Sequence, residues 1–299
     1  MSNNLKYQFL LHFIVLIWGF TGILGDLISL DSYEITFFRT GIAFLSLIVL
    51  GIIFPPKSSL TTRQFFWLLG TGVIVGLHWI TFFYSVKISL SIAVVCMSAS
   101  TLFTSFLEPI IFKRKFLISE LILSIIVSIG IFIIFGFELQ FTLAIIIGLI
   151  SAFFSALFNV LNGTFVKTMP SQSITKYEML GGFLTASVFL YATNNLSSQT
   201  FTISLMDWMW LLILALVCTT FAFIASIWVM KFVTPFTVSI SVNMEPVYTI
   251  VIALIIDYCM GTNKQKMSDG FYFGASIIIL AIFAHAYLKT KKIKADNGV

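Results

Sequence analysis

Long apolar stretches separated by short polar breaks follow one another along the whole chain. Most of them hold about 20 residues, the length that an α-helix needs to cross the apolar core of a bilayer. We therefore predict an all-α integral membrane protein with ten transmembrane helices. The predicted helices cover residues 8–28, 34–54, 64–86, 90–112, 118–137, 142–166, 174–193, 207–231, 235–257 and 270–289.

The basic residues predict how these helices are oriented. Ten helices leave both termini on the same side of the membrane. All Lys and Arg residues then lie on that side except Arg39, Lys87, Lys264 and Lys266. Because cytoplasmic loops are enriched in Lys and Arg, we predict that both termini are cytoplasmic. Residues 290–299 would form a basic cytoplasmic tail.

The fourth and ninth predicted helices contain related segments at matching distances from their ends. Ser98–Phe103 in the fourth is similar to Asn243–Tyr248 in the ninth. A second register would match Glu108-Pro109 with Glu245-Pro246, but Glu108 lies near the end of its helix. We prefer the first register because it keeps the two segments at the same depth.

This repetition predicts two halves of five helices each, residues 1–137 and residues 138–289. Since five is an odd number, the second half must enter the membrane in the opposite sense to the first. Inverted repeats of this kind are typical of alternating-access transporters.

The composition excludes several classes of protein. With 59% hydrophobic and only 10% charged residues, the chain is unlike any soluble globular domain. Topology explains the net charge of +5, so the basic residues do not indicate nucleic-acid binding. Three scattered cysteines indicate neither a disulfide framework nor a metal site. No zinc, phosphate-loop or nucleophile motif is found, so we predict no enzyme and no cofactor.

An ionisable residue stands beside a proline near the middle of the ninth predicted helix. Glu245 precedes Pro246 about ten residues from either end of the apolar stretch. A charge at that depth costs at least ~2–3 kcal/mol, so it normally faces a cavity or a partner. The proline removes a backbone donor and leaves the carbonyl of Val242 without its usual helical bond. Glu245 could exchange a proton, bind a cationic group, or stay protonated and hydrogen-bond that carbonyl.

Other polar and aromatic residues within the predicted helices are candidates for a site. His78 and Trp79 could form an aromatic wall with one titratable group, although a lone histidine often only packs. Trp18 at mid-depth indicates a cavity wall or close helix packing. Asn159 is a further polar candidate, and Thr101 either contacts a neighbouring helix or serves function.

Arg39 lies five residues into the second predicted helix. The simplest interpretation is that its side chain reaches back to the membrane surface. Pairing with Glu34 or Asp26 is an alternative, and a direct contact with a substrate is the least favoured one.

Several segments in this order resemble the drug/metabolite transporter superfamily, and specifically its EamA-type members with ten helices. They are Trp18-Gly19-Phe20, Phe38–Gly41, the hydroxyl-rich start of the fourth helix, Met244–Tyr248 and Gly274–Ile282. The resemblance implies two inverted repeats around a central cavity. It also implies that the cavity is lined by Trp18, His78, Trp79, Thr101, Asn159 and Glu245.

The expected function is therefore secondary active transport, in the direction of export, across a bacterial inner membrane. The substrate would be a small metabolite, such as an amino acid or a related amphipathic compound. Protons could be the coupling ion, through Glu245 or His78. The alternative is a non-transporting membrane receptor or assembly subunit, in which a signalling loop should be exposed. The sequence indicates neither a monomer nor a dimer.

Overall fold

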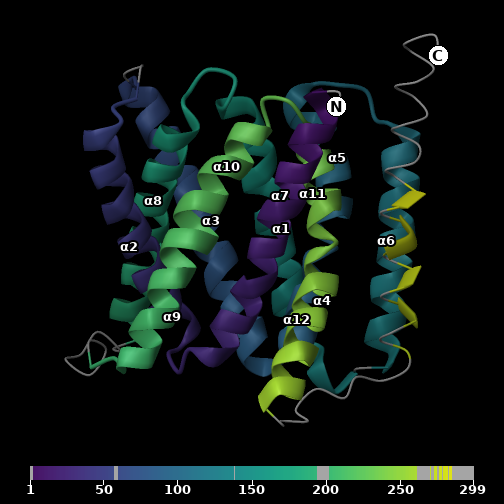
Figure 1. Ribbon diagram of the computed structural model, residues 1–299. Helices are drawn as coiled ribbons and strands as arrows, with labels where there is room; N and C mark the ends of the chain where they lie inside the picture. Colours follow the sequence, from purple (N-terminus) through teal and green to yellow (C-terminus); the bar gives the residue numbers. More distant parts are fainter. Residues whose placement is uncertain are drawn as a thin grey trace.

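The protein is a bundle of long helices that lie side by side (Figure 1). The computed structural model describes residues 3–56, 60–137, 139–193 and 202–260, and ten positions nearer the C-terminus. Those positions are residues 270, 273–274, 276–277, 279–281 and 283–284. Within these residues every regular element is helical, as predicted, and there is no strand.

The first half of the chain begins at α1 and ends at α6. Its helices are α1 (Asn3–Leu27), α2 (Ser32–Ile53), α3 (Thr62–Ile88), α4 (Leu90–Met97), α5 (Ser100–Phe112) and α6 (Ile118–Phe137). Short polar side chains cap the starts, because they satisfy backbone N–H groups that the helix leaves free. Thr61 accepts from the amide of Gln64 before α3, and Ser89 accepts from the amide of Ile92 before α4.

The second half begins with a short 3-10 turn, η1 (Leu139–Phe141), and contains a π-helical segment. Its elements are α7 (Thr142–Phe165), α8 (Ser171–Ala192), α9 (Leu205–Ala215), the π-helix η3 (Leu216–Phe221), α10 (Ala222–Val229), α11 (Pro235–Val242) and α12 (Glu245–Met260). The described residues between 270 and 284 are also helical, and the rest of the tenth predicted helix lies outside the described residues.

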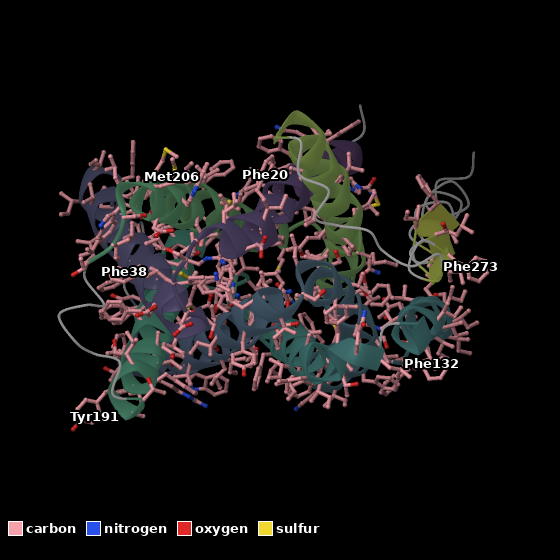
Figure 2. All side chains as sticks on the ribbon, turned by 90° about the horizontal axis from the view of Figure 1, so that it is seen from below. Phe20, Phe38, Phe132, Tyr191, Met206 and Phe273 are labelled. Atoms are coloured by element: carbon pink, nitrogen blue, oxygen red, sulfur yellow. The ribbon has the colours of Figure 1, made fainter. Side chains whose placement is uncertain are left out.

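Six helical segments of the described chain are long and apolar enough to cross a membrane. They are Lys6–Leu27, Ser32–Ile53, Thr62–Ile88, Leu90–Phe112, Leu139–Phe165 and Leu205–Val229. Large apolar side chains cover the outside of the bundle, as expected for contact with lipid. Phe132, Tyr191, Met206 and Phe273 all lie at its periphery, whereas Phe38 lies further in and is buried (Figure 2).

Two of the predicted helices are broken near their middles. The stretch 90–112 is divided at Ser98 and Ala99, between α4 and α5, and the stretch 235–257 at Asn243 and Met244, between α11 and α12. The expectation of a continuous ninth helix with a proline inside it was wrong. Pro246 is instead the second residue of α12, where a missing N–H leaves no bond unmade.

The two breaks fall at positions that the preferred register of the repeat matches with each other. In Figure 1, α4 and α5 run from the lower to the upper edge, and α11 and α12 run the opposite way. The breaks also touch, because the Thr101 hydroxyl donates to Oδ1 of Asn243 at 3.1 Å. One turn further, the hydroxyls of Thr104 and Ser239 lie 2.8 Å apart. The two halves therefore cross at their helix breaks.

Glycines bring another pair of helices from the two halves close together. A Cβ atom added at Gly72 of α3 would lie 2.4 Å from the carbonyl oxygen of Glu178 in α8. One added at Gly181 of α8 would lie 2.4 Å from the carbonyl oxygen of Leu69. Only residues without a side chain permit this backbone contact. The crossing fixes α3, and with it His78 and Trp79, against the second half.

Candidate functional site

A small cavity of about 50 Å³ lies between the two halves of the chain. A space of this size holds a few water molecules. Both halves contribute to its lining, which is mostly aromatic with several polar groups. The lining residues are Trp18, Thr21, Arg39, His78, Trp79, Phe82 and Met97 from the first half, and Ser155, Phe158, Asn159, Phe223, Val242 and Glu245 from the second.

Glu245 reaches this cavity from the first position of α12. The helix break places it there, because the new helix begins with the carboxylate. Only 5% of its surface is exposed, and its carboxylate accepts no hydrogen bond from the residues that the structure describes. The N–H groups at the start of a helix attract negative charge, which favours a carboxylate in this position.

His78 is held in one orientation by Ser151 of α7. Its Nδ1 lies 3.0 Å from the Ser151 carbonyl oxygen, and the Ser151 hydroxyl donates to the carbonyl oxygen of His78 at 2.9 Å. A carbonyl oxygen can only accept, so Nδ1 carries a proton and donates it to Ser151; the Ser151 hydroxyl also lies 2.9 Å from Nδ1. The ring packs 5.4 Å from that of Phe158. His78 is therefore both a packed residue and part of the cavity wall.

Arg39 is buried in the cavity wall, with 1% of its surface exposed. Its guanidinium lies 4.0 Å from the centre of the Trp79 ring, and Nε donates to the Thr219 hydroxyl at 2.6 Å. The interpretation that Arg39 reaches back to the membrane surface was therefore wrong. Pairing with Glu34 or Asp26 was wrong as well, since the ion pairs found among the described residues are those of Arg114 and include neither of these carboxylates.

Aromatic rings form much of the remaining wall. Trp79 meets Phe223 edge to face at 5.6 Å, and Phe223 in turn lies 5.6 Å from Phe158. Trp18 and Asn159, both singled out in the sequence, line the same cavity. If the halves move apart and widen this space, an apolar body would fit between these rings, while the few polar groups would fix its orientation.

Thr101 is the one member of the predicted set that does not line the cavity. Its hydroxyl is fully buried and donates to Asn243 at the helix break. The other five predicted residues, Trp18, His78, Trp79, Asn159 and Glu245, lie together around one space.

Sequence reasoning gave too little weight to Arg39, and it did not find Phe158, Phe223 or Thr219. A charged residue well inside an apolar helix was an available signal for Arg39. The two phenylalanines carried none, because the chain contains 33 of them.

At the lower edge of Figure 1, hydrogen bonds join the halves through Asp207 at the start of α9. Its carboxylate accepts from the amide of Ser29 at 3.0 Å and from the hydroxyl of Ser29 at 2.5 Å. Ser29 lies in the connection between α1 and α2. Lys87 of α3 donates to the carbonyl oxygen of Ile28 in the same connection.

At the upper edge, Glu108 of α5 joins the halves. One oxygen accepts from the amide of Phe236 at the start of α11 at 2.7 Å, and the other from Arg114 at 3.1 Å. Arg114 also donates to Glu120 at 2.6 Å. Partial burial alone would lower the pKa of Arg114, but the hydrogen bond to Glu120 and the charges of both carboxylates outweigh it and raise that pKa.

The chain matches known proteins in sequence and in fold. Residues 5–136 and 142–287 each match the sequence model described as the EamA-like transporter family. No curated protein sequence matches the chain. A solved structure described as "Crystal structure of protein" covers 94% of this chain and 96% of its own, with a TM-score of 0.69 and 11% sequence identity. At such a low identity this likeness shows the fold alone.

Proposed function

Because the chain belongs to the EamA-like transporter family, a family of membrane transporters with two repeats, we propose that it is a secondary active transporter working by alternating access. The observation that carries the proposal is the cavity between the two halves, lined by residues of both. A site of this kind can open to one side or the other when the halves move against each other.

The contacts at the two ends of the bundle support this mechanism. Asp207 joins the halves at one end and Glu108 joins them at the other. With both sets of bonds made, the cavity is small, at about 50 Å³. Breaking one set while keeping the other would open the cavity to one side only, which alternating access requires.

The finer features of the proposal rest on the sequence. They are ten transmembrane helices in two inverted repeats of five, with boundaries at residues 1–137 and 138–289, and both termini and the tail 290–299 in the cytoplasm. The opposite directions of α4–α5 and α11–α12 support the inversion (Figure 1). The basic residues support a bacterial inner membrane orientation with cytoplasmic ends. Export of a small amphipathic metabolite is the expected direction and cargo.

Counterflow in proteoliposomes tests the proposal. Vesicles containing the purified protein are loaded with one unlabelled candidate metabolite and diluted into the labelled compound. A transporter should accumulate the label transiently, whereas a receptor or assembly subunit should not. Asn159→Leu, which changes the cavity wall, should reduce the uptake, and Phe132→Leu on the outer surface serves as the matched control. If neither wild type nor control exchanged any of a broad metabolite panel, the transporter assignment would be wrong.

Protons are the proposed coupling ion, since Glu245 and His78 are titratable groups in the cavity wall. An imposed pH gradient should then drive uptake of the metabolite found in the counterflow assay. If Glu245→Gln and His78→Gln both kept full gradient-driven uptake, proton coupling through these residues would be refuted while transport itself would stand.

A further inference from the structure

The guanidinium of Arg39 has one nitrogen that the protein does not use. Nε donates to the Thr219 hydroxyl at 2.6 Å, and Nη2 lies 3.5 Å from the carbonyl oxygen of Cys218. Nη1 is buried and has no hydrogen-bond partner among the described residues. A buried donor without a partner is costly, and an unpaired cation within a membrane protein is more so. Its retention indicates an acceptor that is not part of the chain.

The surroundings of Arg39 hold it rigidly in this position. Trp79 and Phe83 lie against the guanidinium, with their ring centres 4.0 Å and 5.6 Å away. Both hydrogen-bond acceptors come from the π-helix η3, a kind of helical irregularity that often occurs at functional sites. In η3 the Thr219 hydroxyl also donates to the carbonyl oxygen of Leu214 at 2.8 Å, which fixes the acceptor. The nitrogen without a partner therefore belongs to a guanidinium that its neighbours already hold in place.

Glu245 provides the opposite charge in the same cavity. Arg39 comes from the first half and Glu245 from the second, and their charges attract each other. Nevertheless they do not form an ion pair within the described part of the chain. The carboxylate of Glu245 accepts no hydrogen bond there either. Two residues of the cavity wall thus have polar atoms that the described residues leave unused, a donor on Arg39 and the acceptor oxygens of Glu245.

We propose that Arg39 and Glu245 bind the two opposite charges of one zwitterionic substrate, Arg39 its carboxylate and Glu245 its ammonium group. The body of the substrate would lie between Trp79, Phe158 and Phe223, so it should be apolar. This inference rests on the proposed transport function and names the substrate class of the same cavity. An anion without an ammonium group would be repelled by Glu245, and a cation without a carboxylate by Arg39.

A series of compounds that share one apolar body tests the charge requirement without any substitution in the protein. Leucine is the zwitterion, 4-methylpentanoate lacks the ammonium group, 3-methylbutylamine lacks the carboxylate, and leucinamide has an uncharged amide in its place. Matching series are built on alanine and on phenylalanine, because the proposal does not specify the size of the apolar part of the substrate. Inhibition of zwitterion counterflow by each relative is measured. We expect each single-charge relative to inhibit at least about 100-fold more weakly than its zwitterion.

Charge-removing variants then assign the two ends of the substrate. Arg39→Gln should weaken zwitterion binding and improve that of 3-methylbutylamine relative to wild type. Glu245→Gln should weaken zwitterion binding and improve that of 4-methylpentanoate. Loss of packing alone would not produce these opposite preferences. Arg63→Gln, at an exposed position in the first turn of α3, is the control and should behave as wild type.

The outcomes separate this inference from the proposed function. If the protein exchanged single-charge compounds as well as zwitterions, or exchanged other metabolites but no zwitterion, the charge-pair inference would be overturned and transport would stand. If no compound of any charge class were exchanged, both would fail. Should either variant not fold, as judged by its melting curve, the result with the wild-type series decides.

Discussion

An alanine at position 72 would push α3 away from α8. The added Cβ atom would lie 2.4 Å from the carbonyl oxygen of Glu178 and 2.8 Å from the Cα atom of Gly181. The first distance is about 1 Å short of the 3.4 Å at which ordinary contact begins. Both neighbours are backbone atoms, so no side-chain rotation can relieve the overlap. The two helices, one from each half, must separate or tilt.

Gly70 of the same helix provides a matched control. A Cβ atom added there meets nothing within 4 Å. Both substitutions gain the same helix propensity, up to about 1 kcal/mol, because alanine is the better helix former. The difference in free energy of unfolding between the two variants therefore measures the effect of the overlap at Gly72 alone. Overpacking of this kind costs about 1–3 kcal/mol.

The assay is thermal unfolding of the two purified variants in the same detergent. For a chain of this size, 1 kcal/mol corresponds to a change of roughly 2–4 °C in melting temperature. Gly72→Ala should melt on the order of 2–12 °C below Gly70→Ala. Equal melting temperatures would refute the close backbone approach of α3 and α8, and with it the position assigned to His78 and Trp79.

Three further predictions concern single contacts. Glu108→Gln removes a nearly buried charge that joins α5 to the start of α11, so it should destabilise the protein by about 1–3 kcal/mol; an unchanged melting temperature would contradict the link. Thr101→Val keeps the shape but removes the donor to Asn243. This substitution should lower the free energy of unfolding by about 0.5–1.5 kcal/mol. If the losses of Thr101→Val and Asn243→Leu simply added in the double variant, the hydrogen bond would contribute nothing to stability. Ser151→Ala leaves the carbonyl that orients His78, so this variant should retain most of the counterflow rate. In His78→Phe the counterflow rate should fall roughly tenfold. Equal rates in the two variants would exclude a polar role for the His78 ring.

The sequence by itself determined the membrane class, the helical fold and the repeat. Apolar length and polar breaks are local properties, so the helices could be read residue by residue. The match of Ser98–Phe103 with Asn243–Tyr248 pairs two segments that each begin at a helix break, but it did not predict the breaks themselves. Glu245 could be singled out because a charge deep in an apolar stretch is costly wherever the helix lies.

Only the tertiary structure decided what surrounds each polar group. Nothing local distinguishes Thr101, which bonds another helix, from Asn159, which lines a cavity. Arg39 was expected at the membrane surface, because a lone helix offers its cation no other way to remain solvated. In the bundle, Thr219 and Trp79 replace that water from distant parts of the chain. Contacts between residues far apart in sequence depend on which helices pack together, and the pattern of one helix does not contain that information.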